Sequence, residues 1–453
     1  MKTIFITIFE GVESKNILRT DIFPTIRARK DLRVVFFVKE AARIPHHQKE
    51  FGDSASGIEY VAVPIVKSSG LDRFFQRLKF LLLRTKTTQL WRAMHLQDTK
   101  NYLAYYAGTI GNVLLGRRMF IKISRFLDYY LVQNDDYGQY FDRYKPDLVL
   151  LANLFDEAEV HLLREAKNRR VRTVALINSW DRATSRCVLR LLPDKLIVFN
   201  GTVRVALLDH HDVRDKDIFV AGVPHYDYHF RAPFMEREAF LKKLGVDPKK
   251  KMIVYCPFGV ASSDSDWDII DMLYRFRDEG RFGKDVEIFI RFPPNDILQE
   301  DELKKRPFMR FEHPGMLFSK ERSIDWDMRE DDLKRLSDTL YYMALMICYA
   351  SSISIEGAVF DKPVINMYYE MSKESWQRSP TRQYGKTHYI EALQTGGIRL
   401  VHSEEELVSW VNAYLADPSI DREGRHRLVE QQCAYTDGKS GKRIGDFILS
   451  QII

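Results

Sequence analysis

The sequence predicts an α/β protein with two doubly wound parallel-sheet domains, and three observations lead to this prediction. The chain has 453 residues, and a prior of roughly 150 residues per domain allows two or three domains. Short apolar runs alternate with helical patterns in both halves, as in parallel sheets whose strands are connected by helices. Residues 223–234, with two prolines and many aromatic side chains, interrupt this alternation and are the predicted linker.

The composition is typical of a globular protein, with 45% apolar and 29% charged residues. The 69 lysines and arginines exceed the 63 aspartates and glutamates by only six, and we expect no nucleic-acid partner. The four cysteines lie far apart in the chain, so neither a disulfide framework nor a cysteine metal site is expected. The N-terminus has the pattern of a strand, and no apolar run reaches the length of about 18 residues that a membrane span needs. We therefore expect a cytoplasmic protein.

The first domain is expected over residues 1–225. The run at 147–152 is almost continuously apolar, which is typical of a strand covered on both faces of a parallel sheet. Residues 71–131 show helical patterns without strands and are predicted to be a helical insertion. The predicted strands are 3–9, 32–38, 58–63, 147–152, 173–177, 195–199 and 218–221.

The second domain is expected over residues 232–440, followed by a closing helix at 441–453. Ligands of open parallel sheets bind outside the carboxyl ends of the strands. Two such domains predict a cleft between their carboxyl edges, with the functional residues in the loops that follow the strands. The predicted strands of this domain are 252–256, 286–291, 345–349, 363–367 and 398–401.

The segment after the strand 345–349 is the most informative. Ser351 and Ser352 stand where the next helix begins, and small hydroxyl residues at a helix amino terminus donate hydrogen bonds to an anion. Glu356 lies about one turn further, where a carboxylate suits a sugar diol. The alternative is an ordinary helix cap with a solvated glutamate. Gly259 and Ser262, after the strand 252–256, form a second loop that is expected to contact the donor diphosphate or base.

Carboxylates of the first domain are the candidates for a general base. Asp181 lies in a polar loop after the strand 173–177, and a carboxylate there can deprotonate an acceptor hydroxyl. The alternative is a turn aspartate that caps local amides. Asp156 and Glu157 follow the strand 147–152 and are rival candidates, unless they only complement the dipole of the next helix.

Four segments together resemble one protein family. ASSISIEGAVFDKPVIN (350–366) is similar to the donor-binding helix of GT-B glycosyltransferases, in particular bacterial enzymes that build capsule, O-antigen and teichoic-acid polymers. NSWDRATSRCVLRLLPDKLIVFNGT (178–202), AGVPHYD (221–227) and DGKSGKRI (437–444) resemble further segments of these enzymes, in the same order. The resemblance implies two Rossmann-like domains, a nucleotide-sugar donor as substrate with no bound cofactor, and chemistry without a metal ion.

One strand end departs from the family pattern. In many relatives a His-Pro pair ends the strand before residue 293, and its histidine is linked to the donor phosphate or leaving group. Here residues 292–294 read Phe-Pro-Pro, and a His-Pro pair occurs only later, at His313. Arg291 can take over the phosphate contact, because a guanidinium engages phosphate with two donors. The departure leaves the type of donor open.

The helical insertion begins with a basic amphipathic stretch, residues 71–92. Apolar side chains recur there at helical spacing, and several arginines and lysines lie between them. Basic amphipathic helices lie on anionic membrane surfaces, so we expect a peripheral contact with the inner face of the plasma membrane. The alternative is a helix packed on the protein with solvated arginines and lysines.

The sequence therefore predicts a glycosyltransferase that moves a sugar from a nucleotide donor to a lipid-linked or oligosaccharide acceptor of a cell-surface glycan. Direct attack on the anomeric carbon would make it inverting. A sugar-nucleotide epimerase and a polyol-phosphate transferase of the teichoic-acid type use the same two-domain framework, so both remain alternative functions. A non-catalytic scaffold at the membrane is the alternative from another class.

Overall fold

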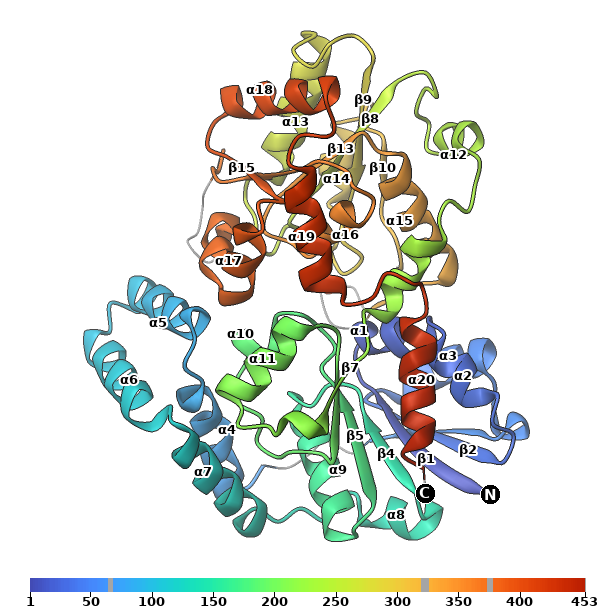
Figure 1. The fold of residues 1–453 in the computed structure, drawn as a ribbon, viewed down its shortest axis with the longest axis vertical. Coiled ribbons are helices and arrows are strands. Elements are labelled where there is room, and N and C mark those ends of the chain that lie inside the picture. The colour runs from blue at the N-terminus through green and yellow to red at the C-terminus, as the bar shows by residue number, and fades with distance from the viewer. Residues whose placement is uncertain (64–67, 319–325, 373–377, 453) are drawn as a thin grey trace. The chain divides into compact units, whose positions relative to one another are not determined.

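The computed structural model describes residues 1–63, 68–318, 326–372 and 378–452. The chain forms two compact units, Met1–His225 together with Cys433–Ile453, and Tyr226–Gln432. Each unit contains one large parallel sheet with helices packed on it (Figure 1). The predicted fold class, two parallel-sheet α/β domains, is confirmed.

The first unit is built on a seven-stranded sheet whose strands all pair in parallel, in the order β3-β2-β1-β4-β5-β6-β7. The strand order reverses between β1 and β4, and at such a point the loops after the two strands diverge and open the carboxyl edge. The strands are β1 (Lys2–Ile8), β2 (Leu32–Val38), β3 (Ile58–Ala62), β4 (Leu148–Leu151), β5 (Arg172–Leu176), β6 (Lys195–Val198) and β7 (Ile218–Val220).

Helices cover both faces of this sheet (Figure 1), and apolar residues such as Phe5 and Ile6, which point to opposite faces, are both buried. The helices that connect its strands are α1 (Gly11–Glu13), α2 (Ile22–Arg27), α3 (Ile44–Phe51), α8 (Gly138–Tyr144), α9 (Glu157–Asn168), α10 (Arg182–Ser185) and α11 (Gly201–His210).

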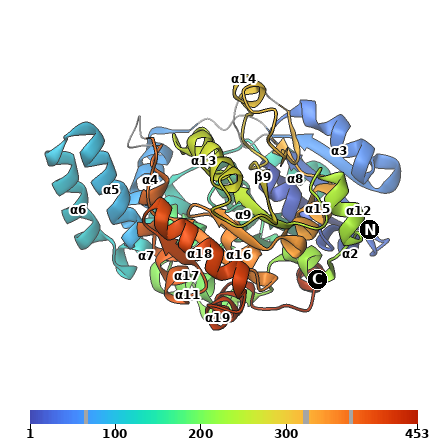
Figure 2. The same ribbon diagram turned by 90° about the horizontal axis from the view of Figure 1, so that it is seen from above.

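The helical insertion lies between β3 and β4, as the sequence predicted. Side chains cap the amino ends of three of its helices, because Ser69, Thr85 and Asn101 accept hydrogen bonds from amides of the first turn. The two views show the second and third of these helices side by side (Figures 1 and 2). The insertion consists of α4 (Gly70–Leu82), α5 (Lys86–Thr99), α6 (Tyr102–Leu115) and α7 (Arg118–Leu131).

The last helix, α20 (Ser440–Ser450), packs on α2 of the same unit. Two glycines allow this close approach. A Cβ atom on Gly441 would lie 2.9 Å from the amide nitrogen of Asp21, and one on Gly445 would lie 2.6 Å from Cβ of Thr25. Gly441 and Gly445 therefore lie on the contact face of this helix.

The second unit is built on a six-stranded parallel sheet in the order β10-β9-β8-β13-β14-β15. Its strand order reverses between β8 and β13, which again opens the carboxyl edge. The strands are β8 (Lys251–Cys256), β9 (Val286–Arg291), β10 (Phe311–Glu312), β13 (Leu345–Cys348), β14 (Val364–Met367) and β15 (Arg399–Val401). A separate antiparallel pair consists of β11 (Met316–Leu317) and β12 (Trp326–Asp327).

Helices flank this second sheet as well. They are α12 (Arg237–Lys243), α13 (Asp266–Asp278), α14 (Glu300–Lys304), α15 (Glu330–Tyr342), α16 (Ile353–Val359), α17 (Thr387–Gln394), α18 (Glu404–Ala416) and α19 (Arg422–Cys433). Within the described ranges, every helix is too short or too polar to cross a bilayer.

Candidate active site

The loop with Ser351 and Ser352 joins β13 to α16 at the carboxyl edge of the second sheet. Ser352 is exposed, and its side chain makes no capping hydrogen bond to the described part of the chain. Ser351 is half-buried, and its hydroxyl accepts a 3.5 Å hydrogen bond from the amide of Ile353. Both hydroxyl groups lie at the first turn of a helix, where amides and the helix dipole favour an anion.

A buried polar network supports this loop from the side of the sheet. The side-chain amide of Asn366 donates a 3.2 Å hydrogen bond to the carbonyl of Tyr349 and a second one to the hydroxyl of Tyr389. Ser354 donates a 3.1 Å hydrogen bond to the side-chain oxygen of Asn366. Sequence reasoning missed this support. The signal for it was an asparagine inside the otherwise apolar strand predicted at 363–367.

Glu356 is buried in the same helix and pairs with a histidine of the predicted linker. His229 Nε2 lies 3.1 Å from Glu356 Oε2, and His229 Nδ1 lies 2.8 Å from the hydroxyl of Ser337. The His229 side chain is only 2% exposed. The Glu356 carboxylate is therefore positioned by a side chain of the predicted linker.

Arg291 ends β9, is buried, and forms an ion pair with Glu312 at the end of the neighbouring strand β10. Burial raises the pKa of the thiol of Cys256, with further contributions from Cys348, Arg291, Glu356 and Glu312. In the sheet register Arg291 follows the Tyr255–Ile290 pair, and Cys348 of β13 pairs with Cys256, so Arg291 and the loop that leads to Glu356 flank the end of β8. The second unit thus brings two predicted donor residues to one edge, Arg291 in an ion pair with Glu312 and Glu356 in contact with His229.

The loop after β8 turns at Gly259, whose φ of +96° is strained for residues with a Cβ. The carboxylate of Asp266 accepts hydrogen bonds from the amides of Phe258 (3.1 Å) and Gly259 (2.7 Å). The amide of Ser262 donates a 2.8 Å hydrogen bond to the carbonyl of Gly259. A Cβ on Gly259 would lie 3.0 Å from Asp296 Oδ2, so this loop also packs against the loop after β9.

His313 follows β10 and reaches the same strand-end loop in which the family's histidine is missing. The pairing of Glu312 with Arg291 places His313 beside the start of the 292–294 segment. Its ring forms hydrogen bonds with the backbone of Pro293 and Asp296. Nε2 is buried and has no partner among the described residues, so these bonds fall on Nδ1. Burial lowers the pKa of His313, and the neutral ring therefore carries its proton on Nδ1 and its lone pair on Nε2.

In the first unit, Asp181 lies in the loop between β5 and α10. Its carboxylate accepts hydrogen bonds from the hydroxyls of Ser179 (2.5 Å) and Ser185 (3.2 Å). Its carbonyl accepts hydrogen bonds from the amides of Thr184 and Ser185. The residue thus shapes the turn after β5 and presents a half-buried carboxylate at the carboxyl edge of the first sheet.

Asp156 is the N-cap of α9, at the carboxyl end of β4. Its carboxylate accepts a 2.9 Å hydrogen bond from the amide of Ala158 and forms an ion pair with Lys39. The first contact is that of a capping residue at the positive end of a helix, and the second pairs the carboxylate with a basic side chain.

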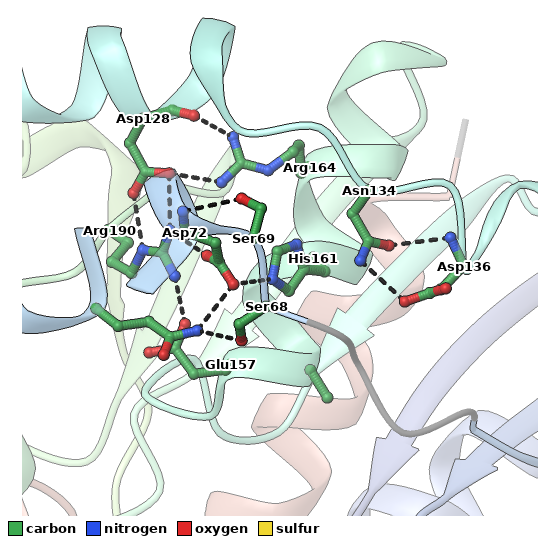
Figure 3. A network of polar contacts seen from close by, with 12 residues as sticks. Ser68, Ser69, Asp72, Asp128, Asn134, Asp136, Glu157, His161, Arg164 and Arg190 are labelled. Atoms are coloured by element: carbon green, nitrogen blue, oxygen red, sulfur yellow. Dashed lines mark hydrogen bonds and ion pairs between the residues drawn. The ribbon is translucent and has the colours of Figure 1, made fainter. Parts of the chain in front are cut away.

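Glu157 belongs to a network that anchors the helical insertion to α9 (Figure 3). It forms ion pairs with Lys79 of α4 and with Arg190. Arg190 also contacts Asp72 of α4 and Asp128 of α7, each at 2.8 Å. Burial works against ionisation of Asp72, but hydrogen bonds from His161 and Arg190 outweigh it and lower its pKa. The network therefore favours the charged form of Asp72 and links α4, α7 and α9 through Arg190.

Two buried carboxyl groups at the ends of β1 and β4 were not predicted. Glu13 accepts hydrogen bonds from the amides of Phe9 and Glu10, and Glu159 accepts them from the amides of Ala152 (3.1 Å) and Asn153 (2.8 Å). Burial, followed by the charge of Glu10, raises the pKa of Glu13 to about 8. Burial and the charge of Glu13 raise the pKa of Glu159 well above its usual value. Carboxylates placed just after two apolar strands were the signal in the sequence.

Two asparagines extend this polar group to the end of β5. Asn16 Nδ2 donates a 3.2 Å hydrogen bond to the carbonyl of Asn178. Asn16 Oδ1 and both side-chain polar atoms of Asn178 are buried without a partner in the part of the chain that the structure describes. The carboxyl edge of the first sheet is therefore rich in hydrogen-bonding groups at β1, β4 and β5.

Comparison with known proteins supports the resemblance seen in the sequence. Residues 185–450 match the model of the family CDP-glycerol:poly(glycerophosphate) glycerophosphotransferase. No curated protein sequence matched the chain.

Solved structures share the fold at low sequence identity. UDP-GlcNAc 2-epimerase from Neisseria meningitidis, bound to UDP-GlcNAc, has a TM-score of 0.54 at 11% identity, with 99% of this chain and 100% of that chain covered. MnaA from S. aureus, in a structure with UDP, has a TM-score of 0.53 at 14% identity over 98% and 95%. The wall teichoic acid polymerase TagF, in a structure with CDPG, has a TM-score of 0.51 at 13% identity over 100% and 88%.

The structural likenesses show the fold, and the family match shows the ancestry of more than half of the chain. The protein is an enzyme of the glycosyl- or glycerophosphate-transferase type, and the chain belongs to the CDP-glycerol:poly(glycerophosphate) glycerophosphotransferase family.

Proposed function

We propose that the enzyme transfers a polyol-phosphate unit from a cytidine-diphosphate-linked donor to a hydroxyl group of a growing surface polymer. The observation that supports this most directly is the family match over residues 185–450, which includes every loop at the carboxyl edge of the second sheet. In this reaction the acceptor oxygen bonds to the phosphorus that bears the polyol. The bond from that phosphorus to the bridging oxygen breaks, and cytidine monophosphate leaves.

The second unit would hold the donor. We assign the hydroxyls of Ser351 and Ser352, with the loop from Gly259 to Ser262, to the diphosphate. Arg291, held by Glu312, would contribute positive charge, and Glu356, held by His229, would accept hydrogen bonds from the ribose. These contacts need no metal ion in the proposed reaction, because amides, hydroxyls and a guanidinium can neutralise the leaving phosphate.

Two side chains are candidates for the base that takes the acceptor proton. Asp181 is the candidate in the first unit, and His313 is the candidate in the second. We favour His313, because the Nε2 lone pair of its neutral imidazole has no partner among the described residues and can accept a proton, whereas the Asp181 carboxylate already accepts hydrogen bonds from two serines. Asp181 would then orient the acceptor, together with the asparagines at the same edge. Asp156 and Glu157 are less suited, since each already forms ion pairs with basic residues.

Transfer of a sugar is the second candidate function. It is favoured by the likeness of residues 350–366 to donor-binding helices of glycosyltransferases and by the position of Glu356 in that helix. In this case the acceptor would attack the anomeric carbon, with inversion, and a nucleoside diphosphate would leave. The released nucleotide therefore distinguishes the two reactions.

Calorimetric titration with CDP-glycerol tests the donor site. The double substitution Ser351→Ala, Ser352→Ala should weaken binding at least about tenfold, since each hydroxyl loses a charge-assisted hydrogen bond to phosphate. Ser419→Ala, at an exposed turn of the same unit, is the matched control and should bind as the wild type does. Unchanged binding by the double variant would refute the donor assignment.

The helical insertion would place the enzyme at an anionic membrane surface. Its helices expose large apolar side chains, among them Leu103, which is 82% exposed, and Phe126, which is 62% exposed. Exposed Arg73 and Arg77 lie on α4, which also exposes Phe74 and Phe80. Lys79, in contrast, is buried and paired with Glu157. Apolar side chains bordered by basic ones are typical of helices that lie in the headgroup region.

Sedimentation with vesicles tests the membrane contact. Leu103→Glu combined with Phe126→Glu should abolish binding to vesicles that contain phosphatidylglycerol. Phe308→Glu changes an equally apolar residue of the second unit, 44% exposed, and should leave binding intact. Equal vesicle binding by all three proteins would exclude this surface.

A further inference from the structure

A cavity of about 580 Å³ lies at the amino edge of the first sheet, the edge opposite to the candidate active site. Arg172 begins β5 and Lys195 begins β6, and both line the cavity. Lys167 enters it from the last turn of α9, and Lys122 enters it from α7 of the helical insertion. The cavity therefore lies within one unit and shares no residue with the loops at the carboxyl ends of the strands.

The lining carries more positive charge than its carboxylates neutralise. Six basic side chains face three acidic ones, a surplus of three positive charges. Asp217 pairs with Lys195 and Arg214, and Asp212 pairs with Lys122. The third carboxylate, of Asp194, accepts hydrogen bonds from the amide and hydroxyl of Thr173. The acidic residues are therefore occupied by local contacts.

Three basic side chains remain without a carboxylate partner among the described residues. Lys167 donates a 3.2 Å hydrogen bond to the carbonyl of Leu192, and Arg172 donates a 2.8 Å one to the side-chain oxygen of Gln451. Nε of Arg172 is buried and has no partner in the described chain. Lys216 is exposed at the rim, and no carboxylate of the described residues pairs with it. A concave surface that keeps three unneutralised cations attracts a multiply charged anion.

We propose that this cavity binds a phosphate group, either that of an anionic lipid headgroup or that of a soluble phosphate ester. Arg172 and Lys167 would contact the phosphate oxygens with charge-assisted hydrogen bonds, and Lys216 would close the rim. A guanidinium and an ammonium group that line one cavity without a carboxylate partner among the described residues suit a phosphate oxygen better than a neutral ligand. The site is separate from the donor site, and it does not depend on which unit the enzyme transfers.

Calorimetric titrations of the full chain with inorganic phosphate and with glycerol 3-phosphate, at fixed ionic strength, test the site. Sedimentation with vesicles of phosphatidylglycerol or of phosphatidylcholine forms the second arm. The double substitution Lys167→Gln, Arg172→Gln should weaken the binding at least about tenfold in the arm that uses the true source. Lys30→Gln, at an exposed position of the same unit, is the matched control and should change nothing.

The two arms separate the sources. Loss of phosphate and glycerol 3-phosphate binding in the double variant assigns the site to a soluble phosphate ester. Loss confined to phosphatidylglycerol vesicles assigns it to a lipid headgroup. Wild-type binding by the double variant in both arms would overturn the proposal. If the double variant does not fold, Lys216→Gln provides the same test, because it removes one charge at an exposed position of the rim. Unchanged binding by this variant would also overturn the proposal.

Discussion

His313 illustrates how hydrogen bonds can set the chemistry of a single side chain. The backbone of Pro293 and Asp296 engages Nδ1, and the lone pair of the buried Nε2 has no partner among the described residues. Because burial lowers the pKa of His313, the ring stays neutral to a lower pH than a solvated histidine would. A base of this kind should keep the enzyme active on the acid side of neutrality.

His313→Gln should lower kcat by about 10² to 10⁴ with little change in KM, if Nε2 takes the acceptor proton. In the wild type, activity should fall only where pH drops below the lowered pKa of His313, since protonation removes the lone pair. This acid limb should disappear in the variant. The measurement is nucleotide release as a function of pH, with His426→Gln on the exposed face of α19 as control. A variant that keeps both rate and acid limb would exclude this role.

Glu13 links the stability of the first unit to pH. Its pKa is about 8 in the folded chain, above the usual value of 4.5, because burial and the charge of Glu10 disfavour ionisation. The unfolded chain therefore loses this proton first as pH rises, and the free energy of unfolding decreases between these two values. Below pH 4.5 Glu13 is protonated in both the folded and the unfolded chain, so its full contribution to the free energy of unfolding is present.

Glu13→Gln keeps a neutral side chain of the same shape and removes this dependence. The variant should be more stable than the wild type at pH 8 by roughly 1 to 3 kcal/mol and equally stable near pH 4. Urea denaturation at both pH values measures the difference. Equal stability at pH 8 would show that the carboxyl group is ionised in the folded chain.

The closing helix α20 depends on two glycines for its contact with α2. Gly445→Ala would force Thr25 and the helix apart, and such overpacking should cost about 1 to 3 kcal/mol. Asp446→Ala lies on the exposed side of the same helix and should change stability by less than about 1 kcal/mol. Thermal unfolding of both variants is the measurement. An unaffected Gly445→Ala variant would mean that α20 does not pack closely on α2.

Buried ion pairs of Arg190 connect the helical insertion to α9, which packs on the sheet. Arg190 contacts Asp72 of α4, Asp128 of α7 and Glu157 of α9, so Arg190→Ala leaves several carboxylates without their partner (Figure 3). We expect a loss of about 3 to 5 kcal/mol in stability and faster proteolysis within residues 70–131. Limited proteolysis with mass mapping measures this. Cleavage at the wild-type rate would show that packing of apolar residues alone holds these helices.

The sequence predicted the whole-molecule architecture because the signals for it are local. Apolar runs such as 147–152 mark buried parallel strands, and they are found as β4 and its neighbours. The partners of individual side chains were not predictable in this way. Arg291 pairs with a residue 21 positions away, and Glu356 contacts one 127 positions away. Glu157 has the acidic, first-turn position that the sequence showed, but its contacts with α4 and Arg190 arise only from the folded chain.

One measurement tests the proposed reaction most directly. The enzyme is incubated with CDP-glycerol and a polymer acceptor that carries free hydroxyl groups, and the released nucleotide is identified by chromatography. Polyol-phosphate transfer predicts cytidine monophosphate, formed only when the acceptor is present and lost in the Ser351→Ala, Ser352→Ala variant. The proposal would be contradicted if CDP-glycerol released no nucleotide while a sugar nucleotide, under the same conditions, released a nucleoside diphosphate.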